Sequence, residues 1–483
     1  MPTIKKNLLY QNAYQLLTIL IPLALAPYLS RVLGAEGIGV YSYTFSVTTY
    51  FVYFAMLGIN HHGARAIASV GGDRETLNKT FSNLLVLHLA VSVIAAAAFA
   101  VYCMFSAEDF QPYFAIQSLL ILAALMDVNW FFMGMERFKI TAMRGISFRL
   151  IMVVCVFIFV KSENDLWIYA LIVSAGALAT QAVIWLFLKR YASFVKPSLS
   201  GIKPHIKPVL LLFVPIVALS VYRTMNKIML GAMTDNVQLG FFANAEKIIL
   251  VPIGFITAFN AVMVPRMSRV NARGDETEKN RLTMISMKYV MLLAFALAFG
   301  IAAIANDFAP LFFGGGFEDC GGLITGLCAL IPFLSFQNVI TSQYLIPNSK
   351  DNLYTIASMA GAVVSIVANA LLIPKFQAMG AVAGLVSAEA VICVAAALFA
   401  KKALPLVSYL KNSVFFLFAG FAMFFLTRYV GSLTGVGVLS VLVRIFAGTV
   451  FYLGVSAAYL YLTKDEFFMG NISVIRAKFH KNG

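Results

Sequence analysis

Residues 81–105 read FSNLLVLHLAVSVIAAAAFAVYCMF and contain no Asp, Glu, Lys or Arg. An α-helix that crosses a lipid bilayer needs about 20 mostly apolar residues. The apolar residues here follow one another directly, without the alternation of period two that marks a transmembrane barrel strand. This stretch therefore predicts one membrane-spanning α-helix.

The rest of the chain repeats this pattern. Of its 483 residues, 61% are hydrophobic and 12% are charged, whereas charged residues make up about a quarter of a soluble globular domain. The loops are too short to form a catalytic domain. We therefore expect an all-α, polytopic membrane protein with about 14 transmembrane helices. Their expected ranges are 11–30, 38–59, 81–105, 113–133, 146–160, 167–188, 208–230, 240–263, 284–305, 321–346, 354–373, 380–400, 412–428 and 437–462.

The formal net charge of +15 is distributed unevenly along the chain. When the loops are numbered alternately from a cytoplasmic N-terminus, only four of the 36 Lys and Arg residues lie in outside loops. Those loops carry acidic residues instead, such as Glu108, Glu163 and Asp319. This bias follows the positive-inside rule for a multi-pass protein of the cell (inner or plasma) membrane with both termini in the cytoplasm. The charge therefore indicates topology, and no nucleic-acid partner is expected.

Two stretches of the sequence resemble each other. Residues 33–41 contain LGA followed by IGVY, and residues 230–242 contain LGA followed by LGFF. An offset of six helices preserves orientation, so the repeat would be parallel. We expect two pseudo-symmetric six-helix lobes, residues 1–207 and 208–400, and two additional helices with a cytoplasmic tail in residues 401–483.

Several Lys and Arg residues lie within the expected spans or close to their ends. A charge at the centre of a membrane helix costs about 2.5–3.5 kcal/mol, so each one needs a physical reason. Cations that line a cavity between the lobes would attract an anionic substrate. Alternatively, their long side chains snorkel to the interface, or one of them forms an ion pair with Glu246. The candidate anion-binding residues are Arg31, Arg65, Arg223, Lys227 and Lys247.

Three carboxylates also fall within the expected spans: Asp127, Glu246 and Glu389. Each could carry a proton or help to hold a coupling cation, and each could equally cap or hydrogen-bond a neighbouring helix. The five cysteines and the tandem His61–His62 have no metal-ligand spacing. No HExxH, Walker or GxSxG motif occurs. We expect no metal site, no catalytic residue and no cofactor other than a coupling ion, H⁺ or Na⁺.

Residues 127–139, DVNWFFMGMERFK, resemble the D-x-N-W-x-F-x-G-x-E-x-F-K segment of Wzx-type polysaccharide and O-antigen repeat-unit flippases. These proteins belong to the multidrug/oligosaccharidyl-lipid/polysaccharide (MOP) exporter superfamily. The resemblance continues in the same order through residues 30–41, 226–248 and 380–389, and it covers residues 1 to about 400. This sequence has Asn226 where the family commonly shows Asp.

The resemblance implies a transporter that turns a polyprenyl-pyrophosphate-linked oligosaccharide repeat unit from the cytoplasmic to the outer leaflet by alternating access. The five cations would hold the pyrophosphate. The ion-coupling candidates would be Asp127, Glu246, Asn369 and Glu389. Membrane lipids would surround the protein, and polysaccharide polymerase or assembly proteins would be its partners.

Two other functions stay open. A cation-coupled multidrug or metabolite antiporter of the same superfamily would have more acidic and aromatic than basic residues at membrane depth. A membrane glycosyltransferase, polymerase or ligase for lipid-linked sugars would need an outside domain larger than the Gly-rich loop 306–320. The residues favour transport of a lipid-linked sugar and no enzymatic activity.

Overall fold

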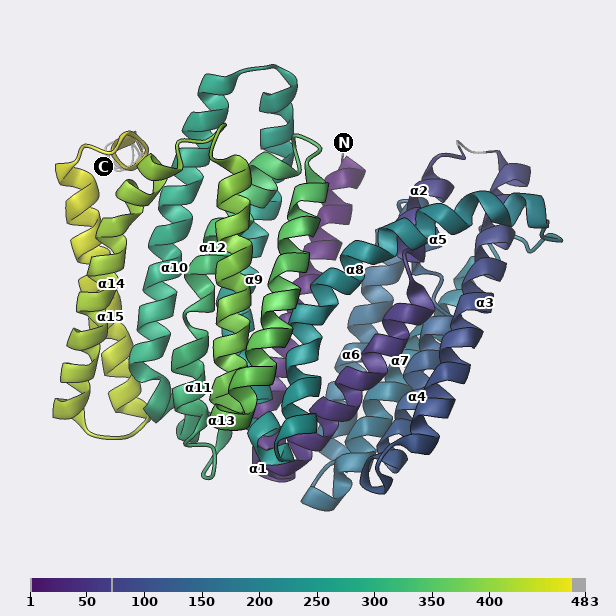
Figure 1. The fold of residues 1–483 in the computed structure, drawn as a ribbon, viewed down its shortest axis with the longest axis horizontal. Coiled ribbons are helices and arrows are strands. Elements are labelled where there is room, and N and C mark those ends of the chain that lie inside the picture. Colours follow the sequence, from purple (N-terminus) through teal and green to yellow (C-terminus); the bar gives the residue numbers. More distant parts are fainter. Residues whose placement is uncertain (1, 71–72, 471–483) are drawn as a thin grey trace, which may run out of the picture. The chain divides into compact units, whose positions relative to one another are not determined.

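The computed structural model describes residues 2–70 and 73–470. All regular structure in that part of the chain is helical (Figure 1). The α-helices are α1 (Pro2–Met56), α2 (Ile59–Ala68), α3 (Arg74–Phe105), α4 (Gln111–Leu125), α5 (Asn129–Gly134), α6 (Phe138–Phe159), α7 (Leu166–Leu188), α8 (Leu199–Met233), α9 (Asn236–Ala272), α10 (Glu276–Phe313), α11 (Cys320–Leu327), α12 (Leu330–Ile340), α13 (Asp351–Ala400), α14 (Leu406–Thr434) and α15 (Val438–Leu462). Short 3₁₀ turns precede α4 and α7, and a π-helical segment, Thr341–Leu345, follows α12.

Twelve helical stretches of the described residues are long and apolar enough to cross a membrane. Two of them, Leu16–Ala68 with 53 residues and Asp351–Ala400 with 50, far exceed one crossing, which takes about 20 residues. The first bends at Gly34, whose φ of 68° is a left-handed conformation that glycine adopts without steric strain. The second has a non-helical residue, Gln377, with a φ of 50°. α1 and α13 therefore each consist of two helical arms joined at a bend, and the first stretch also includes α2.

The two copies of the internal repeat contact each other. A Cβ atom at Gly39 would overlap the carbonyl oxygen of Asn236, and a Cβ atom at Gly240 would overlap that of Ala35. Ala35 and Asn236 each precede a repeat glycine by about one helical turn. The contact is reciprocal, as between two elements related by a two-fold axis. The second arm of α1 and the first turn of α9 therefore cross with their backbones touching.

Three of the expected spans differ from the observed helices. The span expected at 113–133 is broken between α4 and α5 at residues 126–128, and the span expected at 321–346 is divided into α11, α12 and the π-helical segment. The span expected at 146–160 was too short, because α6 begins at Phe138. Its first turns contain basic residues that lower the local hydropathy, although the backbone is already helical.

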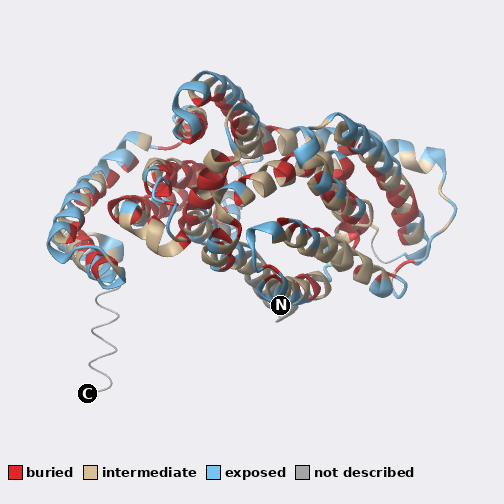
Figure 2. Ribbon diagram, turned by 90° about the horizontal axis from the view of Figure 1, so that it is seen from below, coloured by how far each residue is buried: buried red, intermediate tan, exposed pale blue. Residues whose placement is uncertain are grey.

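Large apolar side chains cover much of the surface. Leu439 and Phe446 of α15, for example, are 75% and 71% exposed. Figure 2 shows buried residues in red on the helix faces that pack on neighbouring helices, with exposed residues in pale blue on other faces. Acyl chains are as apolar as these side chains, so such a surface suits a bilayer and not water. The expectation of an all-helical, multi-pass membrane protein is confirmed.

Contacts divide the chain into two compact units. One comprises Met1–Lys247 and Ala362–Leu385, and the other comprises Ile248–Gly361 and Val386–Gly483. Each of the polar clusters and cavities described below lies within a single unit. The lobe boundaries expected from the sequence stay a prediction.

Candidate functional site

An ion pair joins α8 to α9 in the first unit. The Lys227 ammonium lies 2.5 Å from a carboxylate oxygen of Glu246, and the two side chains are 25% and 17% exposed. Lys227 therefore forms an ion pair with Glu246, which was one of the alternatives that the sequence left open. Because the pair is only partly buried, both groups remain accessible to a ligand.

The next residue, Lys247, is connected to α1. Its Nζ donates a hydrogen bond to Asn244 Oδ1 at 2.9 Å, and Asn244 Nδ2 donates to Oγ of the buried Ser30 at 2.9 Å. Ser30 precedes Arg31, which is exposed and donates to the Pro27 carbonyl oxygen at 3.2 Å. We call Arg31, Lys227, Glu246 and Lys247 the basic junction. It contains three of the five predicted cations and one carboxylate.

The other two predicted cations are not placed at this junction by the structure. Arg65 lies in the last turn of α2 with an exposed side chain. One turn earlier, His62 Nε2 is 2.8 Å from His205 Nδ1 of α8, so this histidine links two helices. The side chain of Arg223 lies outside the described residues.

A cluster of four polar residues lies at the break between α4 and α5. Asp127 accepts hydrogen bonds from the backbone N–H of Asn129 at 2.7 Å and from Gln181 Nε2 at 2.9 Å. Arg144, 9% exposed, donates to Asn129 Oδ1 at 2.8 Å and to Gln181 Oε1 at 3.3 Å. Asn129 and Gln181 thus bridge a carboxylate to a guanidinium. We call these four residues the charged cluster.

A cavity of about 420 Å³ lies beside the charged cluster, between α1, α4, α6 and α7. The guanidinium of Arg149 lies 4.7 Å from the centre of the Tyr14 ring and donates to the Tyr14 hydroxyl at 3.3 Å. The polar residues that line the cavity are Tyr14, Thr49, Asp127, Arg149, Thr180 and Gln181. The predicted residue Asp127 is therefore at a cavity and not only at a helix end.

Arg144, Arg149 and Gln181 were not predicted as site residues. The two arginines could have been found from the expected span 146–160, because this span is shorter than the about 20 residues that a membrane-crossing helix needs. Extension of that span toward its N-terminus would have placed Arg144 inside the membrane with Arg149. Gln181 is an uncharged residue in an apolar stretch and gave no comparable signal.

A second polar cluster in the same unit carries no charge. Asn226 of α8 and Ser365 and Asn369 of α13 are completely buried. Ser365 Oγ donates to Asn226 Oδ1 at 2.9 Å, and Asn369 Nδ2 donates to the same oxygen. Asn369 Oδ1 accepts no hydrogen bond from the described residues and packs against Gly384, where a Cβ atom would overlap it. We call Asn226, Ser365 and Asn369 the neutral cluster.

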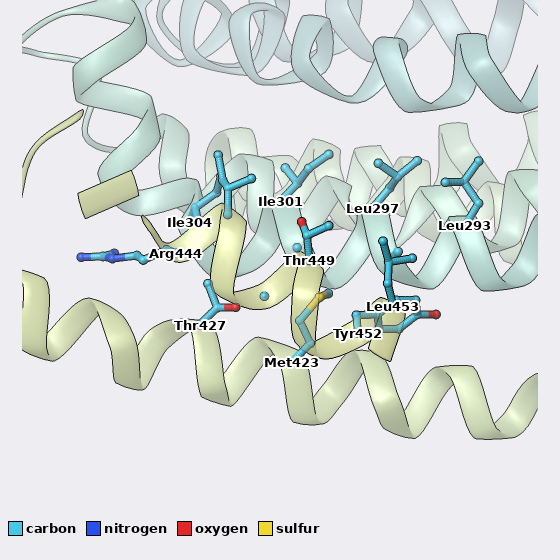
Figure 3. A pocket seen from close by; sticks show the side chains of 14 residues that line it. Leu293, Leu297, Ile301, Ile304, Met423, Thr427, Arg444, Thr449, Tyr452 and Leu453 are labelled. Atoms are coloured by element: carbon cyan, nitrogen blue, oxygen red, sulfur yellow. The ribbon is translucent and has the colours of Figure 1, made fainter. Parts of the chain in front are cut away.

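The second unit contains the remaining predicted carboxylate and a mostly apolar cavity. Glu389 of α13 is 2% exposed. The cavity, of about 360 Å³, is formed by α10, α14 and α15 (Figure 3). Arg444 of α15 is at one end of it, where its guanidinium pairs with Asp307 of α10 and donates to the Gly435 carbonyl oxygen at 2.8 Å. Among the residues that the structure describes, no group of three or more His, Cys, Asp or Glu is arranged to hold a metal ion.

A multi-pass helical bundle with polar clusters and a polar cavity among its helices is typical of membrane transporters. The family model for polysaccharide biosynthesis proteins matches residues 4–271. The chain therefore belongs to the polysaccharide biosynthesis protein family, which confirms the resemblance noted in the sequence. This is a family of transporters and not of enzymes.

Two bacterial relatives match most of the chain. A "Putative O-antigen transporter" of Shigella dysenteriae is 24% identical over 392 residues, which are 80% of this chain and 98% of the relative. A protein of the same description from Escherichia coli (strain K12) is 23% identical over 402 residues, 81% of this chain and 95% of the relative.

Solved structures share the fold. The inward closed conformation of the lipid II flippase MurJ superposes with a TM-score of 0.75 over 94% of this chain and 98% of its own, at 13% identity. An inward-facing multidrug resistance MATE family transporter of the MOP superfamily gives a TM-score of 0.60 over 78% of this chain and 94% of its own, at 15% identity. The fold is therefore that of the MOP transporters.

Proposed function

We propose that this protein is a flippase that moves a polyprenyl-pyrophosphate-linked oligosaccharide repeat unit from the cytoplasmic to the outer leaflet of the cell membrane. The observation that carries the proposal is the basic junction, where the Lys227–Glu246 ion pair adjoins Lys247, and Lys247 is connected through Asn244 to Ser30, the neighbour of Arg31. A pyrophosphate is a polyanion, and charge-assisted hydrogen bonds from Lys and Arg offset the loss of its water shell. The oligosaccharide would cross in a hydrated chamber while the lipid tail stays in the bilayer.

The proposed topology has 14 transmembrane helices and both termini in the cytoplasm. The bends at Gly34 and Gln377 support this count, because each divides a stretch of at least 50 residues into two arms of spanning length. The reciprocal contact of the repeat glycines supports two pseudo-symmetric six-helix lobes, followed by two additional helices. Rocking of one lobe against the other would expose the site to each side in turn.

In this mechanism Arg31, Lys227 and Lys247 of the basic junction, together with Arg65 and Arg223, hold the pyrophosphate. A coupling ion, H⁺ or Na⁺, would bind at one of four predicted residues: Asp127, Glu246, Asn369 and Glu389. An amide does not titrate in the physiological range, so Asn369 suits Na⁺ and the carboxylates suit either ion. Polymerase or assembly proteins would receive the repeat unit at the outer leaflet.

Complementation of a strain that lacks its own flippase tests the proposal. We expect Lys247→Ala and Arg223→Ala to reduce export of surface polysaccharide at unchanged protein level. Arg428→Ala is the matched control, because Arg428 is an exposed cation on α14, far along the chain from the basic junction. Normal export by both Lys247→Ala and Arg223→Ala would contradict the assignment.

One observation favours a second candidate, a cation-coupled multidrug or metabolite antiporter. The cavity beside the charged cluster places Asp127 among lining residues that include Tyr14 and Phe45, and a carboxylate with aromatic rings attracts an organic cation, although Arg149 of the same lining would repel it. An antiporter would raise the resistance of a sensitive strain to cationic drugs, and Asp127→Asn would abolish that resistance. A flippase would leave drug sensitivity unchanged.

A further inference from the structure

The cavity beside the charged cluster has a balanced charge. Asp127 and Arg149 are the two charged residues among those that line it. Arg144 stands behind the lining, where Asn129 and Gln181 accept its hydrogen bonds. A phosphate group would meet the Asp127 carboxylate, and an organic cation would meet the Arg149 guanidinium. A neutral ligand avoids both repulsions.

The hydrogen-bonding groups of the cavity favour a polar ligand. Each carboxylate oxygen of Asp127 accepts one hydrogen bond from the protein and has lone pairs for another. Thr180 and Thr49 add hydroxyl groups to the lining. An acyl chain in this place would remove these groups from water without any replacement for their hydrogen bonds, which is unfavourable.

The rest of the lining is apolar. It includes Phe45, Val52, Met56, Leu120, Met152 and Val173. A ligand that fits both parts has hydroxyl groups along its edges and C–H bonds on its faces, which describes a pyranose ring. The volume of about 420 Å³ lies at the small end of the about 300–1,000 Å³ range of small-molecule sites, so it suits one sugar and not a whole oligosaccharide.

We infer that this cavity is a subsite for one uncharged sugar residue of the transported repeat unit. Asp127 accepts hydrogen bonds from sugar hydroxyls, and Arg149 and Gln181 donate to them. This inference rests on the proposed function, since it assigns part of the same substrate. It adds a sugar-binding position in the first unit that is separate from the basic junction in its residues and in its ligand chemistry.

Binding of two probes to the purified full-length protein in lipid nanodiscs tests the inference. One probe is polyprenyl pyrophosphate without sugar, and the other is the same lipid carrying the repeat unit from the host's own lipid-linked pool. We expect Asp127→Asn to weaken binding of the sugar-bearing probe about tenfold and to leave the sugar-free probe unaffected. Lys247→Ala should weaken binding of both probes.

A second pair of variants keeps the test valid if Asp127→Asn is poorly folded. Ala123 of α4 lines the cavity, whereas Ala115 of the same helix is exposed and does not. Ala123→Leu fills part of the cavity without removing a polar group and should weaken only the sugar-bearing probe, also about tenfold. Ala115→Leu should bind both probes like the wild type.

The outcomes separate the two proposals. If Ala123→Leu and a folded Asp127→Asn both bind the sugar-bearing probe like the wild type, the sugar subsite is refuted while the flippase proposal stands. The same holds if these variants weaken both probes equally, because the cavity then serves the lipid pyrophosphate or the fold. If the wild type binds neither probe, the proposed function itself is wrong.

Discussion

The charged cluster and the neutral cluster show two ways to place polar groups among apolar helices. In the charged cluster, two amide groups connect Asp127 to Arg144, and a cavity lies alongside. In the neutral cluster, two amides and a hydroxyl are completely buried, and Asn369 packs directly against Gly384. Ionised groups lose much more than amides when they leave water. The charged cluster therefore needs both an opposite charge and a polar cavity, while the neutral cluster can be closed.

The difference has a consequence for function. A cluster that is closed around a glycine has no room for a large ligand, so it contributes to helix packing or holds a small ion. A cluster beside a cavity can exchange its hydrogen bonds with a substrate. Within one unit, the charged cluster is thus the better candidate for contact with the transported molecule.

The largest expected effect comes from Arg144→Met. It leaves the Asp127 carboxylate without the cation to which Asn129 and Gln181 connect it, and it removes the donor to both amide oxygens; loss of a partner costs a buried polar group about 1–3 kcal/mol, and more where the group is charged. We expect a large fall in the yield and in the thermal unfolding temperature of the purified protein. The double variant Arg144→Met/Asp127→Asn removes both charges and should recover most of the loss. A double variant as unstable as Arg144→Met would show that the two charges are not coupled.

The next largest effect concerns the closed packing of the neutral cluster. Gly384→Ala forces a Cβ atom against Asn369 Oδ1, and overpacking of this kind costs about 1–3 kcal/mol. Thermal unfolding measures the loss, and Asn369→Ala in the same chain should relieve part of it. Gly454→Ala on α15 is the control, because no atom lies within 4 Å of a Cβ built there. Equal unfolding temperatures of Gly384→Ala and Gly454→Ala would contradict the close contact between Gly384 and Asn369.

A smaller effect is expected when one hydrogen bond of the neutral cluster is removed. Ser365→Ala deletes the donor to Asn226 Oδ1, which keeps its hydrogen bond from Asn369. The expected loss of stability is about 1 kcal/mol, well below that of Arg144→Met. A loss as large as that of Arg144→Met would mean that the two clusters do not differ in the way described.

The smallest expected effect is that of pH, which should not change the contribution of the neutral cluster to stability. The neutral cluster contains no group that titrates between about pH 5 and pH 8. The stability difference between Ser365→Ala and the wild type should therefore be the same at both pH values. Chemical unfolding at each pH measures it, and a change in this difference with pH would point to a titrating neighbour.

Much of the fold follows from the sequence, because hydropathy locates spanning helices along a chain. It also located Lys227 and Glu246 on consecutive helices, which is why their ion pair was among the alternatives. Hydropathy does not give the rotation of a helix about its axis, however. To predict the charged cluster, one would have to know how α4, α6 and α7 are each rotated about their axes. For this reason Arg144 and Gln181 were missed. The interruption at residues 126–128 was missed because the residues on both sides of Asp127 and Asn129 are apolar.

Arg444 has a consequence for biogenesis. Arg444 is 5% exposed, and its acidic partner, Asp307, is synthesised 137 residues earlier. The last helical hairpin thus enters the membrane with an arginine that is neutralised only when α10 is already beside it. Insertion of α15 therefore depends on an earlier helix, and a chain from which α10 is deleted would insert α15 with Arg444 lacking its acidic partner.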